Sequence, residues 1–395
     1  MDYNYRIPIS LLRFLGACIF GNAQTHYSGL DDAGRAKLED QVKCFGMDTW
    51  FYRFLHEVLP EEKRTEYQKT YWGRQMRAMQ EEQELKRIYR IFAAHGVRFA
   101  PFKGADLAYR LYPDAALRTF CDWDIWIYPD DCNRALDVLA EDGWQVPGLY
   151  QKCDYSSTGL DNFHHFPPHR RKSYLLEPHF SLSKFDDIDP VELWNFTADG
   201  PEGAGYRVLS PELNLLMLTQ HASSRFFLHA QIPQLLTDAA MVMQKEKVDF
   251  AKLRKLSNRW HLPYPGNLLA AFPEFFSEEL ISEFDAAPDK TSLYRNLFEL
   301  RGKLGNSLST AINMNKCADK NEFVGGVLKK LFKLSPDTIR HIYHLPKHGA
   351  WGNVAWSYIC WIWTRSKRAM QGIAQKTEFH DYMRIVKEID SFPRG

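Results

Sequence analysis

The sequence lacks the cysteine patterns that build a disulfide framework or a zinc ribbon. Its 395 residues include seven cysteines, an odd number, scattered along the chain without any C-x-x-C pair. This usage fits a reducing compartment, and we expect a cytoplasmic protein. The chain also lacks an apolar run of the ~18 residues that a membrane-spanning helix needs. These absences favour a protein stabilised by a packed core.

The chain also has little net charge, since 50 Lys and Arg offset 49 Asp and Glu to leave a formal charge of +1. That balance argues against a protein that binds nucleic acid over its whole surface. The charge is uneven, however, because residues 300–395 contain 16 basic and 7 acidic residues. The same segment carries Trp356, Trp361 and Trp363. Such a mixture could contact RNA or an anionic membrane surface, and a solvated face over an aromatic core is the competing interpretation.

Neither an internal repeat nor a low-complexity tract is present, and the length fits two or three domains of ~100–200 residues. We predict a helical region at 1–95, an α/β core at 96–205 and a helical domain at 206–395 that is basic after residue 300. The clearest predicted helix spans 61–95, where Leu85, Ile88 and Phe92 recur at helical spacing. Gly96 is a natural stop for that helix.

The middle of the chain changes from helical spacing to short apolar runs. Predicted strands at 97–102, 120–128 and 173–182 alternate with predicted helices at 105–112 and 129–140. A polar loop rich in histidine covers 151–172. This order indicates an α/β or α+β unit, and helical patterns resume at Ser210.

An aspartate pair in the second predicted strand is the strongest sign of chemistry. Asp122 and Asp124 are two positions apart, so in a strand their side chains project from one face. Two neighbouring carboxylates repel each other unless a cation lies between them, and Mg²⁺ bound by carboxylates and substrate phosphates meets that need. The alternative is a sheet-end pair held by Arg118 or by helix caps. The D-x-D pattern of Asp187 and Asp189 reads instead as a solvated turn or a helix cap.

Lys103 and Gly104 lie at the junction between the first predicted strand and the helix that follows it. A glycine there lets a phosphate approach the N–H groups at the start of the helix. A tight strand-to-helix turn is the alternative explanation. The combination of this junction with an aspartate pair on the next strand is more informative than either motif alone.

These motifs together resemble a known family. The residues that carry the resemblance are Lys103-Gly104, Tyr112-Pro113, Arg118, Asp122-x-Asp124, His164-His165-Phe166-Pro167-Pro168, Leu176-Glu177-Pro178-His179, His221, Arg225 and Asp238. Over roughly residues 75–262 the chain resembles the DNA polymerase beta-like nucleotidyltransferase superfamily and, more closely, its bacterial "uncharacterised nucleotidyltransferase" family. It departs from the superfamily at Ala105, which replaces a serine that often contacts phosphate, and in the long spacing from Gly104 to Asp122.

The resemblance implies an α+β fold, in which a small mixed sheet is flanked by N-terminal and C-terminal helical regions. It further implies nucleotidyl transfer that depends on Mg²⁺, with Mn²⁺ as a substitute. A nucleoside monophosphate would move from a nucleoside triphosphate to an acceptor hydroxyl, and pyrophosphate would leave. The acceptor could be a small molecule, a sugar, a protein or an RNA end.

The expected site follows from the same resemblance. Asp122, Asp124 and Glu177 would be the catalytic residues and the metal ligands, with Glu177 as the third carboxylate. The expected nucleotide contacts are Lys103, Gly104, Arg118, His221 and Arg225. A salt bridge from Glu177 to Arg170, Arg171 or Lys172 is the competing interpretation. Helix–helix packing is the competing interpretation of His221 and Arg225, and Asp238 would be structural or would support the residues that contact the substrate.

Two other functions stay open at this point. A helical adaptor with a degenerate nucleotidyltransferase core could bind a partner through its basic C-terminal face, with no stable partner evident from the sequence. His164, His165, His169 and His179 also raise the possibility of a zinc or histidine hydrolase. No H-E-x-x-H motif occurs, and a loop that contacts nucleotide or acceptor is a further interpretation of these histidines.

Overall fold

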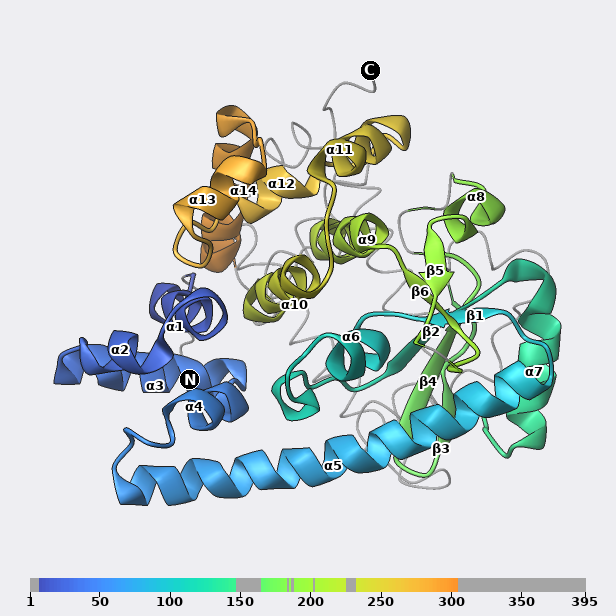
Figure 1. Ribbon diagram of the computed structural model, residues 1–395, viewed down its shortest axis with the longest axis horizontal. Coiled ribbons are helices and arrows are strands. Elements are labelled where there is room, and N and C mark those ends of the chain that lie inside the picture. The colour runs from blue at the N-terminus through green and yellow to red at the C-terminus, as the bar shows by residue number, and fades with distance from the viewer. Residues whose placement is uncertain are drawn as a thin grey trace, which may run out of the picture. The chain divides into compact units, whose positions relative to one another are not determined.

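The computed structural model describes residues 7–146, 165–182, 185, 188–201, 203–224 and 232–304 (Figure 1). The chain divides into two compact units, Pro8–Thr291 with Pro393–Gly395, and Met1–Ile7 with Ser292–Phe392. Every strand of the described chain lies in the first unit. No described helix is both long enough and apolar enough to cross a membrane. The domain boundaries expected at residues 95 and 205 stay a prediction.

A small mixed sheet organises the first unit. Its strands are β1 (Phe99–Pro101), β2 (Trp123–Ile127), β3 (His169–Arg171) and β4 (Tyr174–His179), in the order β1-β2-β4-β3. β2 runs antiparallel to β1 and parallel to β4, whereas β3 and β4 are antiparallel. The parallel pair aligns Asp124 with Glu177 and Trp126 with His179. The register therefore brings two acidic positions that are distant in sequence onto neighbouring strands.

The two faces of β2 have different surroundings, because successive side chains of a strand point to opposite sides. Trp123, Ile125 and Ile127 are buried in a hydrophobic cluster with residues of α5 (Glu61–Ala94) and α7 (Cys132–Glu141), both of which lie against the sheet (Figure 1). Asp124 lies on the other face of the strand. The apolar face thus fixes the strand in the core and leaves the opposite face available for polar groups.

Helices fill the N-terminal part of the unit. Before α5 they are α1 (Ile9–Phe20), α2 (Ala23–Ser28), α3 (Asp32–Phe45) and α4 (Asp48–Leu55). The 34 residues of α5 make it about 51 Å long. Acidic Glu61 and Glu62 occupy its first turn, where their negative charges interact favourably with the positive end of the helix dipole and stabilise the helix. Gly96 follows its end with a φ of 66°, a conformation that glycine adopts without steric cost.

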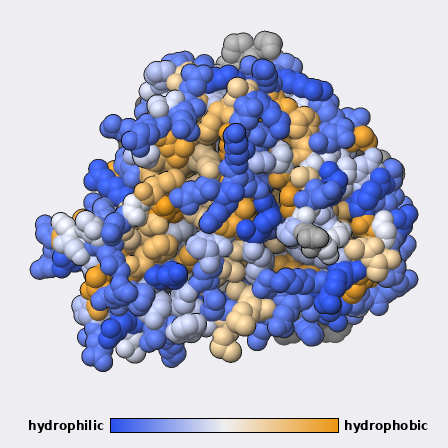
Figure 2. All heavy atoms as spheres, in the orientation of Figure 1, coloured by the Kyte–Doolittle hydropathy of each residue, from blue (hydrophilic) through white to orange (hydrophobic). Residues whose placement is uncertain are grey.

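Shorter elements surround the sheet and continue after it. They are α6 (Gly104–Arg110), the 3-10 turns η1 (Ala115–Leu117) and η2 (Pro129–Asp131), α8 (Pro190–Trp194), the hairpin strands β5 (Thr197–Asp199) and β6 (Arg207–Leu209), α9 (Pro211–Ser224), α10 (Ile232–Lys245), α11 (Phe250–Arg259), α12 (Pro265–Leu269), α13 (Glu278–Glu283) and α14 (Pro288–Leu304). Most of the surface seen in Figure 2 is hydrophilic.

The structure confirms the expected α+β class, because helical regions precede and follow the small mixed sheet along the sequence. The three strands predicted at 97–102, 120–128 and 173–182 correspond to β1, β2 and β4. One expectation was wrong, since the loop predicted at 151–172 contains β3. The basic segment after residue 304, which is most of the helical domain's predicted basic part, lies outside the described residues.

Candidate functional site

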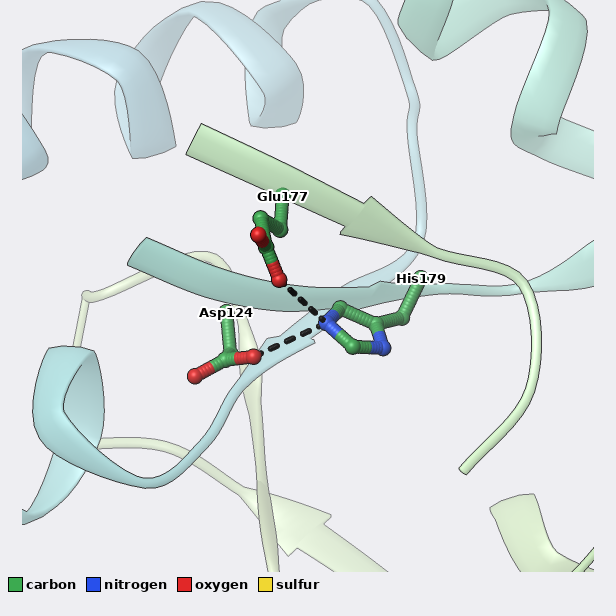
Figure 3. A group of neighbouring side chains, drawn as sticks. All are labelled: Asp124, Glu177 and His179. Carbon is green, nitrogen blue, oxygen red and sulfur yellow. Dashed lines mark hydrogen bonds and ion pairs between the residues drawn. The ribbon is translucent and has the colours of Figure 1, made fainter. Parts of the chain in front are cut away.

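Two carboxylates and an imidazole meet on the polar face of β2 and β4. Asp124 and Glu177 are aligned partners on the two parallel strands, and His179 lies two positions after Glu177 on the same face. One ligand atom from each of the three residues lies within 4.8 Å of the others. Figure 3 shows the three side chains pointing toward one another. We call Asp124, Glu177 and His179 the acidic cluster.

His179 connects the two acids of the cluster. Its Nε2 lies 2.9 Å from Oδ1 of Asp124 and 3.9 Å from Oε2 of Glu177 (Figure 3). Burial lowers the pKa of His179 to about 4, despite the opposing effect of Asp124. The ring is therefore neutral near pH 7. Because a carboxylate only accepts hydrogen bonds, the neutral ring donates from Nε2 to Asp124.

Lys103 supplies the positive charge of the site. It lies between β1 and α6 with φ 52° and ψ −130°, a conformation that non-glycine residues rarely adopt. Its Nζ donates to Oδ1 of Asp124 at 2.8 Å, and its side chain is only 16% exposed. Unusual backbone conformations of this kind concentrate at functional sites, where the surrounding structure holds them.

The two acids of the cluster differ in their affinity for protons. Burial alone would raise the pKa of Asp124, but the Lys103 ammonium and the bond from His179 outweigh it and hold that pKa well below its usual range. The pKa of Glu177 is raised instead, first by burial and then by the negative charge of Asp124. Asp122 raises it further from its position one residue before β2. Asp124 therefore stays ionised, while Glu177 holds a proton more readily.

A family model described as "Uncharacterised nucleotidyltransferase" matches residues 52–270, which is more than half of the chain and includes every residue of this site. The chain belongs to the uncharacterised nucleotidyltransferase family. Membership supports nucleotidyl transfer as the general chemistry of the protein. Neither a curated protein nor a solved structure matches the chain.

Gly104 has a packing role in this family member. It is the buried first residue of α6, and the Phe120 side chain fills the space next to its Cα. An added Cβ would lie 2.5 Å from Cβ and Cγ of Phe120, closer than real Cβ contacts. The close approach to Phe120 thus requires a glycine here. The expected phosphate contact at Gly104 stays a prediction.

Arg118 is occupied by a buried ion pair. Its Nε and one terminal nitrogen donate to the two carboxylate oxygens of Asp238 at 2.8 and 2.9 Å, and the other terminal nitrogen donates to the carbonyl of Thr119. The hydroxyl of Tyr112 donates to the same carboxylate at 2.6 Å. This network attaches the segment before β2 to helix α10. The expected contact between Arg118 and phosphate would require phosphate to take the place of Asp238, and it stays a prediction.

The competing interpretation of Glu177 was a salt bridge to a basic residue on or next to β3, and the contacts of β3 bear on it. Arg171 pairs with Glu84 of α5 and lies 3.8 Å from Asp142, so it does not serve Glu177. His169 directs its Nδ1 to the carbonyl of Pro167 at 2.8 Å. Glu177 instead shares the polar face with Asp124.

Some expected contacts cannot be compared with the structure. His221 belongs to α9, but its side chain lies outside the described residues, as do Arg225 and His164. The sequence has His179 two positions after Glu177 in the predicted strand at 173–182, but it does not reveal the bond from His179 to Asp124. The available signal was the i, i+2 spacing in a strand, which shows a shared face and does not identify a partner on another strand.

Proposed function

We propose that this protein is a Mg²⁺-dependent nucleotidyltransferase that moves a nucleoside monophosphate from a nucleoside triphosphate to an acceptor hydroxyl. The observation that carries the proposal is the alignment of Asp124 with Glu177 on adjacent parallel strands, within reach of His179. Membership of the nucleotidyltransferase family supports the same reaction class.

The donor set of the site fits a hard divalent cation. Asp124 and Glu177 offer carboxylate oxygens, and Asp122 is close enough to raise the pKa of Glu177. Magnesium favours such oxygens together with substrate phosphates, and when bound it would neutralise the charge of the triphosphate. We assign Asp122, Asp124 and Glu177 as the residues that would hold it. His179 would orient Asp124 by the bond from its Nε2, as neighbouring groups orient metal ligands elsewhere.

Glu177 and Asp124 would have different roles in the reaction. Glu177, whose pKa is raised, is suited to accept the proton of the acceptor hydroxyl. The hydroxyl oxygen forms a bond to the α-phosphorus, the bond from that phosphorus to the bridging oxygen breaks, and pyrophosphate leaves with the bond electrons. Asp124 stays ionised throughout because its pKa is depressed. Lys103, which helps to keep Asp124 ionised, would also be placed to donate to a phosphate oxygen of the substrate.

The test combines binding with turnover. The protein is heated with each of the four ribonucleoside triphosphates, with and without Mg²⁺, and stabilisation that requires both components is expected. A triphosphate at ~100 times its Kd adds about 2.7 kcal/mol to the stability. Pyrophosphate release is then followed with candidate acceptors.

Glu177→Gln is the decisive variant, because it keeps the size of the side chain and removes its charge. Triphosphate binding should persist while the chemical step slows by roughly 10²–10⁴, the usual contribution of a general base. Asp137→Asn, on the exposed surface of α7, is the matched control and should behave as wild type. Turnover of Glu177→Gln at the wild-type rate would remove Glu177 from the mechanism. Failure of every triphosphate to bind with Mg²⁺ would favour an adaptor built on a non-catalytic core.

A further inference from the structure

Three exposed hydrophobic side chains follow one another on the outer face of α5. Trp72, Met76 and Met79 are 52%, 63% and 56% exposed, and their spacing of four and three residues places them on one side of the helix. The other large hydrophobic side chains that are exposed in the described chain are Val58 and Val191, on other segments. Single exposed apolar residues are ordinary, whereas a contiguous group indicates an interaction surface. We call Trp72, Met76 and Met79 the α5 stripe.

Gly73 lies beside the α5 stripe, and packing within the chain does not account for it. It is in the interior of α5, where glycine weakens a helix relative to alanine. A Cβ added at Gly73 would have no heavy atom of the described chain within 4 Å, so the fold leaves room for a side chain there. Glycine is useful where another backbone approaches closely. Its place next to Trp72 therefore indicates a second helix that crosses the stripe.

The charges on this face of α5 change sign along the helix. They are acidic before the α5 stripe, apart from Lys69, and basic after it, and the exposed residues that show this are Glu62, Glu66, Lys86 and Arg90. A parallel copy of the helix would bring like charges together. An antiparallel copy would bring the acidic end of each helix to the basic end of the other, and it would also oppose the two helix dipoles.

The spacing of these charges fits a two-fold axis at Met76. Glu66 and Lys86 are each ten positions from Met76, about 15 Å along the helix, and Glu62 and Arg90 are each fourteen positions away, about 21 Å. In an antiparallel pair centred on Met76, each of these acids therefore lies at the level of a base on the other copy. The sequence of α5 is thus complementary to itself.

The helix is long enough for such a contact. α5 runs along one edge of the first unit, and Figure 2 shows a small hydrophobic patch at that edge (Figure 1). A strip about 10 Å wide along its 34 residues would bury roughly 1,000 Å² over two copies, the lower limit for a specific interface. An open groove between α4, α5 and the segment from α6 to η1 borders the α5 stripe, because Trp72 and Met79 line it. The groove gives room for side chains of the other copy.

We propose that two copies of this chain associate through their α5 helices, antiparallel about a two-fold axis near Met76. In such a symmetric pair the same patch serves both subunits. The α5 stripe is then buried against its own copy, Gly73 lets the two backbones approach, and the acidic and basic ends of the helices pair. None of the residues of the acidic cluster belongs to α5, so the proposal does not depend on the chemistry of that site.

Sedimentation of the full chain at about 1–100 µM measures the association. Wild type is expected to approach twice the 46.1 kDa mass of one chain as its concentration rises. Met76→Glu places two like charges at the axis and should weaken association at least ~10-fold, with an unchanged circular dichroism spectrum. Val191→Glu makes a similar change at an exposed residue of α8, so it is the matched control and should associate as wild type.

Gly73→Ala separates the stability of the helix from the contact between copies. Because alanine favours a helix over glycine, the dilute monomeric variant should unfold at a higher urea concentration than wild type. The added methyl groups should nevertheless hold the two backbones apart, and the variant should associate several-fold more weakly. Association as tight as that of wild type would contradict the close approach at the axis and overturn the proposal.

An exchange of charge tests the antiparallel direction. Glu62→Lys and Arg90→Glu should each weaken association at low salt, and the two changes combined in one chain should restore it. Glu62 and Arg90 are the sharper pair to exchange, because Glu66 and Lys86 already form exposed ion pairs within the chain. A parallel pair would gain nothing from the double variant. The proposal is also wrong if wild type stays monomeric at about 100 µM or if Met76→Glu associates like wild type.

Discussion

The backbone of Lys103 provides a test in which glycine should stabilise relative to alanine. At ordinary helical positions glycine is less favourable than alanine by about 0.5–1 kcal/mol. Lys103, however, has φ 52° and ψ −130°. A non-glycine residue held in such a conformation costs about 1–3 kcal/mol. Replacing alanine by glycine at this position should therefore raise the free energy of unfolding by about 1–2 kcal/mol.

Both variants first lose the ion pair with Asp124. The side chains of Lys103 and Asp124 are 16% and 5% exposed, so removing the ammonium leaves a largely buried carboxylate with His179 as its remaining bonded partner. Breaking a buried pair from one side costs about 3–5 kcal/mol, and the partial exposure of Lys103 favours the lower figure. We expect Lys103→Ala to lose about 3 kcal/mol and Lys103→Gly to lose about 1–2 kcal/mol.

Urea denaturation at pH 7 in EDTA measures both variants against wild type. Lys86, an exposed residue of α5 with ordinary helical geometry, provides the matched pair of controls. There Lys86→Gly should be less stable than Lys86→Ala by about 1 kcal/mol, the reverse order. If Lys103→Gly is no more stable than Lys103→Ala, the backbone conformation of Lys103 is not costly for a non-glycine residue, and the prediction is wrong.

Two further predictions concern buried charge. Because the folded pKa of His179 is about 4 and its unfolded value about 6.5, the unfolded chain binds a proton first as the pH falls, and up to about 3 kcal/mol of stability is lost between pH 6.5 and 4. His179→Gln should lack this part of the slope in pH-dependent denaturation, and an unchanged slope would contradict the burial argument. Arg118→Ala and Asp238→Ala should each cost about 3–5 kcal/mol, and the double variant should cost clearly less than the sum. If Arg118→Ala unfolds like wild type but binds triphosphate weakly, the phosphate assignment replaces the structural one.

Local patterns were sufficient for most of the fold. Strands β1, β2 and β4 are apolar runs bounded by turn residues, and α5 carries a regular apolar stripe, so each could be predicted from spacing alone. β3 could not, because Arg170 and Arg171 make up most of an edge strand with three residues. The hairpin of β5 and β6 is equally short. Such segments pair because the fold brings them together.

The sequence was sufficient to predict which strand face each site residue occupies, but not which residues its side chain contacts. Strand periodicity orients Asp124, and Glu177 lies in the strand predicted at 173–182, which the structure pairs with the strand of Asp124. The partners of these residues depend on contacts across long sequence separations, such as Lys103 with Asp124, which no spacing rule supplies. A D-x-D pattern is also ambiguous by itself, since Asp189 in the second copy caps α8 by accepting from the N–H of Val191.

The parallel pairing of β2 with β4 also affects the order of folding events. Asp124 and Glu177 are 53 positions apart, so the chain must close a long loop before the two carboxylates meet. Closing that loop has an entropic free-energy cost of about 3.5 kcal/mol, and contacts between residues so far apart in sequence form slowly. Helices such as α5, whose contacts are local, can form earlier. Formation of the acidic cluster is therefore a late event in folding, because Asp124 and Glu177 meet only in molecules whose sheet has closed.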